Sequence, residues 1–471
     1  FFNDTATTEI YTSLFVAASD VYKRQMLYEE PRHVRSGKNA GADERALDFA
    51  AAGRETSSPR HPPVLRQNRM MKLTSNDPFW LIKNGLIESY PSLRQDVKTD
   101  ILIIGGGITG ALMAHKCLEE GYQTTLMDRR EIATGSTSAT TSMLQYEIDV
   151  PLFKLSGTIG QRAAEANYWA CSDSIDELGR IIKKVKSNCG FEKKESLYFA
   201  TYRKDVPDLK KEYQARKNCG LPVKWLSTGE IARRYKLQTS HGGILSAQGA
   251  SMDAFKFTHD LLDYNHQKGL KIFDRTGVKS TEYKRDKVHL ITEYGNSVVA
   301  KKVIYCSGYE STELIKDDFV KLLSTYAIVG ERNQDDQTDL SGTLFWSTAD
   351  PYIYMRTTDD NRILIGGEDE DFLDAKRRDE LLNEKRLKLE KELKKMFPLY
   401  KFRTDYVWAG TFGETKDGLP YIGEHPNVKN SYFLLGFGGN GITFSVIGKN
   451  VIADLLKNKR NALAQYYRFK R

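Results

Sequence analysis

The sequence has few cysteines, and they show none of the spacings that build metal sites or disulfide frameworks. The five cysteines of the 471 residues are scattered along the chain, and no Cys-x-x-Cys occurs. The eight histidines likewise fall in no metal-ligand spacing. We therefore expect no metal site and no disulfide network, and a reducing, cytoplasmic location fits best.

Long apolar runs and concentrated positive charge are also missing. No stretch approaches the roughly 20 apolar residues that span a bilayer, and the first residues lack the pattern of a secretory signal. The net charge of +8 is spread along the chain without a basic block flanked by aromatic residues. The sequence therefore predicts no integral membrane segment and no nucleic acid partner. A content of 40% hydrophobic and 28% charged residues is typical of a globular protein.

The N-terminal part of the chain differs from the rest. Residues 1–69 show no sustained apolar periodicity and end in a polar, proline-bearing stretch, so we interpret them as a disordered or artefactual extension. Residues 70–97 follow as an N-terminal anchor segment. In it, Trp80, Leu81 and Ile82 are expected to pack on the domain that comes next.

Residues 99–128 carry the strongest motif of the chain. A short apolar run leads into Gly105, Gly107 and Gly110, which form a Gly-x-Gly-x-x-Gly turn, and a helical pattern follows. Such glycines allow a tight turn, the close approach of a pyrophosphate, and close packing of the helix on the strand. Asp128 ends the next strand-like run, roughly 20 residues beyond the first glycine, where a carboxylate can bind a ribose diol. The stretch predicts a dinucleotide-binding site.

Two further stretches suit the same kind of ligand. Residues 133–145 form a loop rich in serine and threonine, whose small hydroxyl side chains can close over a phosphate or a ribityl chain. Near the end of the sequence, residues 436–441 form a second glycine cluster that opens a helix after an apolar strand. The N-terminal end of that helix would direct N–H groups at an electron-rich group.

The pattern of helices and strands favours two interleaved domains. Asp253 is expected to cap a helix that runs to about Gln267, and Thr228 to cap a short helix. A charged helix is expected from Asp374 to Met396. Parallel-type β-α-β pieces alternate with antiparallel-looking β stretches, which indicates an α/β fold with a doubly wound, discontinuous, Rossmann-like domain and an interleaved α+β substrate domain. We assign residues 98–180, 252–322 and 404–460 to the dinucleotide-binding domain, residues 181–251 and 323–403 to the substrate domain, and residues 461–471 to a tail.

Several of these motifs together resemble the FAD-dependent D-amino-acid oxidase superfamily. The motifs are DILIIGGGITGALMAH, the acid at Asp128, VIYCSGYES, KDGLPYIGEHP and GFGGNGI, and the resemblance covers about residues 76–457. Members of that family include glycine and sarcosine oxidases, D-amino-acid dehydrogenases and γ-glutamylputrescine oxidoreductases.

The resemblance implies that the Rossmann-like domain binds FAD. The pyrophosphate would lie over the first glycine turn, the adenosine ribose on Asp128, and the adenine against the backbone of Val278. Residues 440–442 would lie beside the pyrimidine ring of the isoalloxazine. The cofactor-binding residues expected in this way are Gly105, Gly107, Ile108, Thr109, Gly110, Asp128, Arg129, Ser136, Thr137, Ser138, Val278, Ser307, Gly308, Gly410, Gly438, Gly439, Asn440, Gly441 and Ile442.

The chain departs from that family at two positions. Amino-acid oxidases of the family commonly carry an arginine that binds the substrate carboxylate, and Phe412 stands at that position here. A buried carboxylate opposite a phenyl ring would be unpaired and costly. Arg356 is our candidate for another anchor, with a solvated or structural role as the equal alternative. Sarcosine oxidases tether FAD through a cysteine at the position of Gly410, so we expect FAD to be bound non-covalently.

The resemblance also implies a reaction. We expect an enzyme that oxidises a C–N bond of a primary or secondary amine by hydride transfer to flavin N5, after which the imine hydrolyses. Tyr354, Arg356 and Phe412 are the expected catalytic and substrate-pocket residues, and the electron acceptor would be oxygen or a quinone-linked carrier. The first alternative is a D-amino-acid or glycine oxidase or dehydrogenase with a different carboxylate anchor. The second is a nicotinamide-binding, non-catalytic module.

Overall fold

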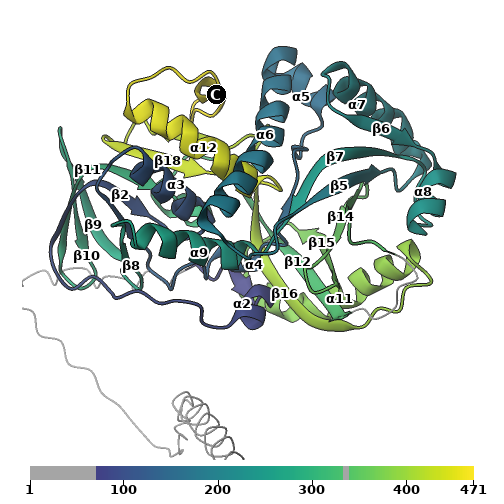
Figure 1. Cartoon of the computed structure of the whole chain (residues 1–471), viewed down its shortest axis with the longest axis horizontal. Coiled ribbons are helices and arrows are strands. Elements are labelled where there is room, and N and C mark those ends of the chain that lie inside the picture. Colours follow the sequence, from purple (N-terminus) through teal and green to yellow (C-terminus); the bar gives the residue numbers. More distant parts are fainter. Residues whose placement is uncertain (1–70, 333–338) are drawn as a thin grey trace, which may run out of the picture. The chain divides into compact units, whose positions relative to one another are not determined.

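Two β-sheets organise the part of the chain that the structure describes. The structure is a computed structural model, and it describes residues 71–332 and 339–471 (Figure 1). Our interpretation of residues 1–69 lies outside these residues. One sheet has eight strands and the other has ten, and helices cover both.

The eight-stranded sheet has a parallel centre. Its strands in spatial order are β17 (Tyr421–Glu424), β18 (Ser431–Leu435), β11 (Ser297–Tyr305), β2 (Val97–Ile104), β3 (Thr124–Met127) and β8 (Lys271–Phe273), with β10 (Val288–Thr292) and β9 (Val278–Tyr283) continuing from β11. The strands from β18 to β8 run parallel. Ile101, Leu102 and Ile103 of β2 are at most 2% exposed, because a strand covered on both faces needs apolar residues at every position. This sheet confirms the predicted α/β class.

Four helices pack against one another beside this sheet (Figure 1). They are α3 (Ile108–Glu119), α6 (Gln161–Val185), α9 (Ala254–His266) and α12 (Gly441–Leu456). The hydroxyls of Thr109 and Ser445 lie 2.7 Å apart and join the first turns of α3 and α12. Asp253 caps α9 as predicted, because its carboxylate accepts a hydrogen bond from the Lys256 N–H at 2.9 Å. Among the described helices, none is long and apolar enough to cross a bilayer.

The ten-stranded sheet is mainly antiparallel. Its strands in spatial order are β1 (Thr74–Ser75), β16 (Thr404–Glu414), β12 (Lys321–Arg332), β15 (Arg362–Glu370), β14 (Ile353–Thr357), β13 (Thr343–Ser347), β5 (Glu192–Phe199), β7 (Gly243–Ser251) and β4 (Met143–Leu144), and β6 (Val223–Leu226) pairs with β7. β16 falls within residues 404–460, which we assigned to the dinucleotide-binding domain. It pairs with β12, so the structure places it in the other sheet.

Two further helices begin at residues whose side chains cap them. Helix α11 (Ala375–Met396) packs against β12, β15 and β16, and Asp374 caps it by accepting a hydrogen bond from the Arg377 N–H at 2.9 Å. Helix α8 (Thr228–Tyr235) is capped by Ser227, one residue before the expected Thr228. Within residues 71–332 and 339–471, the remaining helices of four or more residues are α4 (Ser136–Ala139), α5 (Leu152–Ile159), α7 (Val206–Asn218) and α10 (Ser311–Leu314), together with α2 described below.

The segment before β2 is held by a short helix, α2 (Phe79–Asn84). Phe79 and Trp80 are 2% and 1% exposed, and the Trp80 indole N–H donates to the Thr140 carbonyl at 2.6 Å. Ile82, which we expected to pack, is 47% exposed instead. Phe79 and Trp80 join a hydrophobic core that also contains residues from both sheets, including Ile103 and Trp408. The anchor therefore rests on the first two residues of α2.

The anchor gives a prediction for stability. Trp80→Ala removes a buried indole and its hydrogen bond, so we expect a loss of about 3–5 kcal/mol in the free energy of unfolding. Chemical denaturation would measure it. The control is Ile82→Ala on the same helix, which should change the free energy by about 0.5 kcal/mol or less because its side chain is exposed. Equal effects of the two substitutions would contradict the anchoring role of Trp80.

Candidate functional site

The first glycine turn joins β2 to α3 and leaves space before the helix. Gly105 has a φ of +112°, and a side chain there would collide with the Cys306 carbonyl at the end of β11. A side chain at Gly110 would collide with the Gly105 carbonyl. At Gly107, the N-cap of α3, an added Cβ would meet only the Thr137 hydroxyl, at 2.9 Å. The fold itself thus requires the first and third glycines, whereas the second keeps the N-terminus of α3 open.

The serine- and threonine-rich loop lies at this helix start, as the sequence predicts. Thr137, in α4, accepts a hydrogen bond from the Ile108 N–H at 3.0 Å. The Ser138 hydroxyl donates to the Gly135 carbonyl at 2.9 Å, and Ser136 begins α4. The structure therefore brings the loop and the first glycine turn together, with N–H groups and hydroxyls that suit a phosphate.

Asp128 stands at the end of β3 beside the glycine turn. Its carboxylate accepts hydrogen bonds from the N–H groups of Gly106 at 2.6 Å and Arg130 at 2.7 Å. Burial raises the pKa of Asp128, while these two bonds and the Arg130 charge oppose the rise. A carboxylate has about four lone-pair positions, so two remain for a ribose diol. The Thr276 N–H donates to the Asp128 carbonyl at 2.7 Å, which brings the chain just before Val278 alongside.

A charged cluster joins this region to the turn after β11. Arg129 forms ion pairs with Glu310 and, at 3.3 Å, with Glu313, and Arg130 donates to Glu310 at 2.9 Å. Glu310 lies two residues after Gly308, so the cluster fixes the turn that carries Ser307 and Gly308. Glu310 falls within the VIYCSGYES motif, but the sequence alone assigned it no role. Among the described residues, the Ser307 hydroxyl and the Arg129 Nε are buried without a partner, as is typical of groups that contact a ligand.

The second glycine cluster leads into α12 with its N-terminus uncapped. Gly438, with a φ of +72°, donates its N–H to the Gly413 carbonyl at 2.8 Å, and the Gly439 N–H donates to Asp149 at 2.9 Å. Asn440 is the N-cap residue of α12, yet its side chain caps no N–H. Its amide donates to the Gln145 carbonyl at 3.0 Å, and its Oδ1 is buried without a partner within the described chain. The positive end of α12 is thus available to an electron-rich group at Gly441 and Ile442.

Three tyrosines and two aspartates lie next to this second cluster, and we call them the carboxylate–tyrosine group. They are Asp149, Tyr309, Tyr352, Tyr354 and Asp369. The Tyr309 ring stacks on Phe437 with centroids 5.6 Å apart, and the Tyr352 and Tyr354 centroids are also 5.6 Å apart. A side chain at Gly438 would collide with Asp149. The group therefore borders the turn that opens α12.

The titration of these residues reflects one shared environment. Burial, followed by the charge of Asp369 or Asp149, raises the pKa of each of the three tyrosines, so all three phenols are neutral at pH 7. Burial also raises the pKa of both aspartates to about 6, and the Glu414 charge adds to each rise. Asp149 is exposed by its solvent-accessible surface, although the protein atoms around its carboxylate desolvate it. Sequence reasoning missed both aspartates, because neither stands in a recognisable motif.

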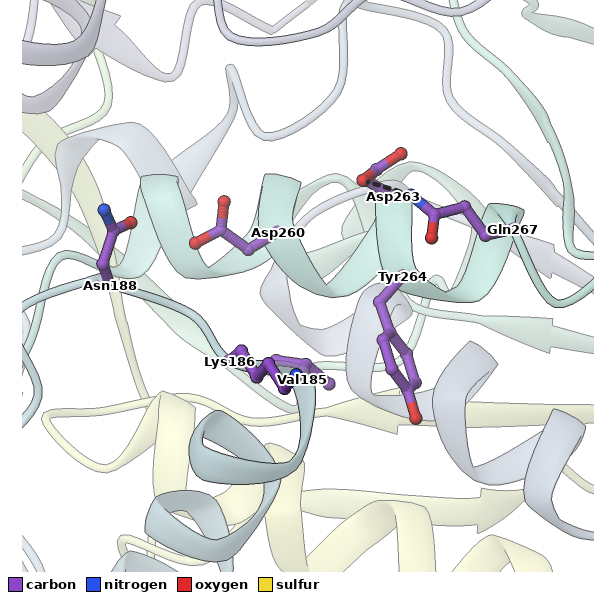
Figure 2. Close-up of a pocket in the computed structure, with 7 residues that line it drawn as sticks. All are labelled: Val185, Lys186, Asn188, Asp260, Asp263, Tyr264 and Gln267. Atoms are coloured by element: carbon purple, nitrogen blue, oxygen red, sulfur yellow. Dashed lines mark hydrogen bonds between the residues drawn. The ribbon is translucent and has the colours of Figure 1, made fainter.

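A separate pocket lies between the end of α6 and α9 (Figure 2). It has a volume of about 360 Å³ and is lined by Val185, Lys186, Asn188, Asp260, Asp263, Tyr264 and Gln267. Its polar side chains pair with one another and with neighbours: Gln267 donates to Asp263 at 2.9 Å, and Asp260 accepts from Ser187 at 2.5 Å. None of the lining residues belongs to the glycine turns or the carboxylate–tyrosine group, so we assign it no role in the site.

The three residues expected at the substrate end have different surroundings. Tyr354 belongs to the carboxylate–tyrosine group, and Phe412 lies on β16 opposite Leu323, partly exposed. Arg356 is 2% exposed and donates to the carbonyls of Thr141 at 2.7 Å and Met252 at 2.9 Å. Burial lowers the pKa of Arg356 to about 10.

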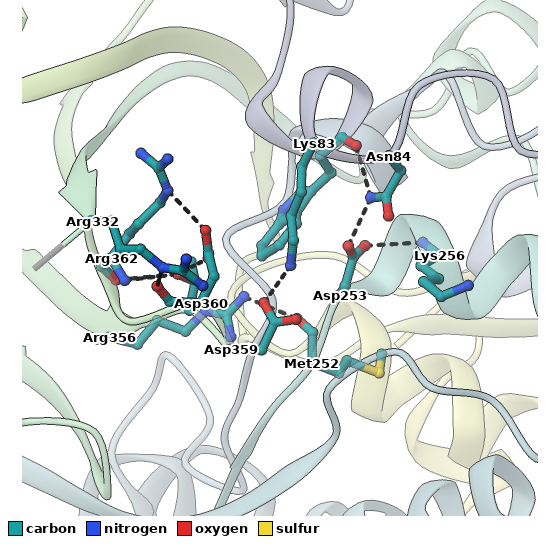
Figure 3. Close-up of polar contacts among 12 residues, drawn as sticks. Lys83, Asn84, Met252, Asp253, Lys256, Arg332, Arg356, Asp359, Asp360 and Arg362 are labelled. Carbon is teal, nitrogen blue, oxygen red and sulfur yellow. Dashed lines mark hydrogen bonds and ion pairs between the residues drawn. The ribbon is translucent and has the colours of Figure 1, made fainter. Parts of the chain in front are cut away.

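The contacts of Arg356 bear on the two roles that we weighed for it, a carboxylate anchor and a structural residue. Its guanidinium lies over the Trp80 ring at 5.1 Å, near the network in which Lys83 pairs with Asp359 and Asn84 donates to Asp253 (Figure 3). Two backbone carbonyls and an aromatic ring already engage it. The structural alternative that we weighed equally therefore describes Arg356 better.

The second glycine of the first turn gives a prediction for cofactor binding. Gly107→Ala should leave the fold intact, because the added methyl meets only a hydroxyl, yet it should weaken FAD by roughly tenfold or more by filling the pyrophosphate's space. Titration of apoprotein with FAD, followed by fluorescence, would measure it. Gly157→Ala is the control, since nothing lies within 4 Å of an added Cβ there. Unchanged FAD affinity of the Gly107 variant would place the pyrophosphate elsewhere.

The carboxylate after β3 gives a second prediction. Asp128→Ala should weaken FAD by about 1–3 kcal/mol, as the loss of a charge-assisted hydrogen bond does. The same titration would show it, and circular dichroism would establish that the fold persists without the bonds from Gly106 and Arg130. If the affinity were unchanged, the ribose would be held by other groups.

Comparisons with known proteins indicate the family to which the chain belongs. The family described as FAD dependent oxidoreductase matches residues 100–455. Glycine oxidase of Geobacillus kaustophilus is 24% identical over 77% of this chain and 94% of its own length. The γ-glutamylputrescine oxidoreductase of Escherichia coli is 23% identical over 78% of this chain and 86% of its own.

A solved structure shows the same fold. The crystal structure of the Geobacillus kaustophilus glycine oxidase superposes with a TM-score of 0.67, covering 79% of this chain and 99% of that one at 21% identity. The open helix N-termini, the glycine turns and the unpartnered Ser307 and Asn440 atoms fit FAD. The chain belongs to the family of FAD-dependent oxidoreductases.

Proposed function

We propose that this oxidoreductase oxidises the C–N bond of a primary or secondary amine that carries no carboxylate group. The main support is the carboxylate–tyrosine group, which places two aspartates and three neutral tyrosines beside the second glycine cluster. In addition, Phe412 stands where the family commonly has its carboxylate-binding arginine. This environment favours a cationic or neutral ligand over an anionic one.

The chain's own groups would contribute position and electrostatics. FAD, when bound, supplies the chemistry by accepting a hydride at N5. The open N-terminus of α12, at residues 440–442, would stabilise the negative charge that reduction places on the ring system. Tyr309, Tyr352 and Tyr354 would shield the reacting amine from water, because their phenols are neutral and their rings are largely apolar. The imine product would then hydrolyse in water.

Oxidation of an amino acid is the alternative, and the similarity to glycine oxidase favours it. An amino-acid substrate needs a cation to pair with its carboxylate. The Nε and Nη2 atoms of Arg356 already donate to the carbonyls of Thr141 and Met252, so this edge of the guanidinium is not free to bind a substrate carboxylate. The alternative thus requires an anchor other than the one we considered.

A panel of substrates separates the two reactions. Under anaerobic conditions we expect alkylamines to bleach the flavin's visible absorption, and glycine, N-methylglycine and D-alanine to bleach it much more slowly, because their carboxylates would face Asp149 and Asp369. Stopped-flow absorbance of the purified full-length chain measures each rate. Denaturation followed by filtration tests whether the flavin leaves the protein, as non-covalent FAD should. Bleaching by amino acids alone would disprove the amine proposal.

A further inference from the structure

Asp369 has different neighbours from the acidic residues on either side of it in β15. Glu368 and Glu370 both pair with Lys385 of α11, at 3.1 and 2.7 Å. The strand is irregular here, because Gly367 and Glu368 have positive φ angles and the pairing with β12 shifts its register. Asp369 lies near Thr325, whose strand partner is Gly410, one of the residues expected to line the flavin. Asp369 thus faces the carboxylate–tyrosine group, whereas its neighbours face the helix.

The carboxylate of Asp369 forms no ion pair within the described chain. Both of its oxygens are inaccessible to solvent, and burial raises its pKa by more than a hydrogen bond from the Thr325 hydroxyl lowers it. The charges nearby are the negative ones of Glu414 and Asp149, and the positive one of Lys385, whose ammonium is already paired on the other face. An unpaired buried charge destabilises a fold strongly. A cation bound at this position would remove that cost.

Aromatic rings form the surroundings of this carboxylate. The Tyr354 ring lies flat on the Gly366 backbone, where an added Cβ would meet it at 2.5 Å, and Tyr352 adjoins it. Tyr309 covers Gly413 in the same way, with 2.7 Å to an added Cβ. Tyrosine faces attract organic cations. Gly366 and Gly413, on the two strands that flank β12, therefore leave room for rings that suit a cationic ligand.

The reacting nitrogen cannot be the group that Asp369 binds. An amine must be uncharged to lose a hydride from its α-carbon, because the nitrogen lone pair stabilises the iminium that forms. A carboxylate in contact with that nitrogen would favour its protonated form and so oppose the reaction. The partner of Asp369 is therefore a second cationic centre on the same molecule.

We propose, building on the proposed amine oxidation, that Asp369, Tyr352 and Tyr354 form a cation subsite that binds the non-reacting ammonium of a diamine. Asp149 adds a second negative charge to the site from the side of the second glycine cluster. The subsite makes the enzyme selective for diamines over monoamines of equal length and excludes amino acids that carry an unpaired carboxylate.

The test compares 1,4-diaminobutane with butylamine on the FAD-loaded enzyme, because these differ only in the second nitrogen. For the wild type we expect kcat/KM for the diamine to exceed that for the monoamine by about tenfold or more. In Asp369→Asn the ratio should fall to about one. The control is Asp371→Asn, two residues further along the chain, where an exposed carboxylate pairs with Lys321. In this variant the ratio of kcat/KM for the diamine to that for the monoamine should equal the wild-type ratio.

A binding measurement keeps the subsite testable apart from turnover. tert-Butylammonium has no α-hydrogen and cannot be oxidised, so its dissociation constant can be measured from its perturbation of the flavin spectrum. It should bind the wild type roughly tenfold more tightly than Asp369→Asn. tert-Butanol, its neutral counterpart, should bind both proteins alike.

The outcomes distinguish the two proposals. Equal kcat/KM for diamine and monoamine in the wild type would overturn the subsite and leave amine oxidation standing. Bleaching by amino acids alone, with tert-butylammonium binding that depends on Asp369, would overturn amine oxidation and keep the cation subsite. If Asp369→Asn does not fold, the wild-type ratio alone decides, because a value near one contradicts the subsite.

Discussion

The close approach of backbone to backbone at the first glycine turn is the constraint on which the site depends. α3 can start against the ends of β2 and β11 only because Gly105 and Gly110 carry no side chains. That position sets α3 beside α12, where the hydroxyls of Thr109 and Ser445 meet. Two helix N-termini then stand at the carboxyl ends of parallel strands, the edge where α/β sheets bind their ligands. Both halves of an extended cofactor would therefore be bound along this one edge of the sheet.

The cofactor half could be predicted from the sequence because its determinants are local. A glycine turn depends on the φ angles and contacts of a few consecutive residues. A helix cap depends on a side chain and a backbone N–H that are three residues apart. Asp253 was predicted as a cap for this reason, and the structure confirms it. The cap of α8 shifted by one position, from Thr228 to Ser227, because either hydroxyl satisfies the local rule.

The substrate half could not be predicted, because it is set by contacts between distant segments. The acids of residues 368–371 look like a solvated run in sequence. Only the folded chain shows that Glu368 and Glu370 pair with Lys385 whereas Asp369 lies near Thr325. Likewise, the partners of Arg356 come from Thr141 and Met252, more than a hundred residues away, and no local pattern distinguishes such an arginine from a free one.

The charges of the site imply that the two nitrogens of the substrate have different protonation states. Negative charge at Asp149 and Asp369 attracts an ammonium ion and keeps it protonated, whereas loss of a hydride requires a neutral nitrogen. One nitrogen cannot meet both demands at once. Two nitrogens can, when one lies among the tyrosines beside Asp369 and the other lies where the α12 N-terminus favours negative charge on the cofactor and disfavours a cation. The spacing between these two positions, rather than either position alone, would therefore decide which chain length of diamine is oxidised.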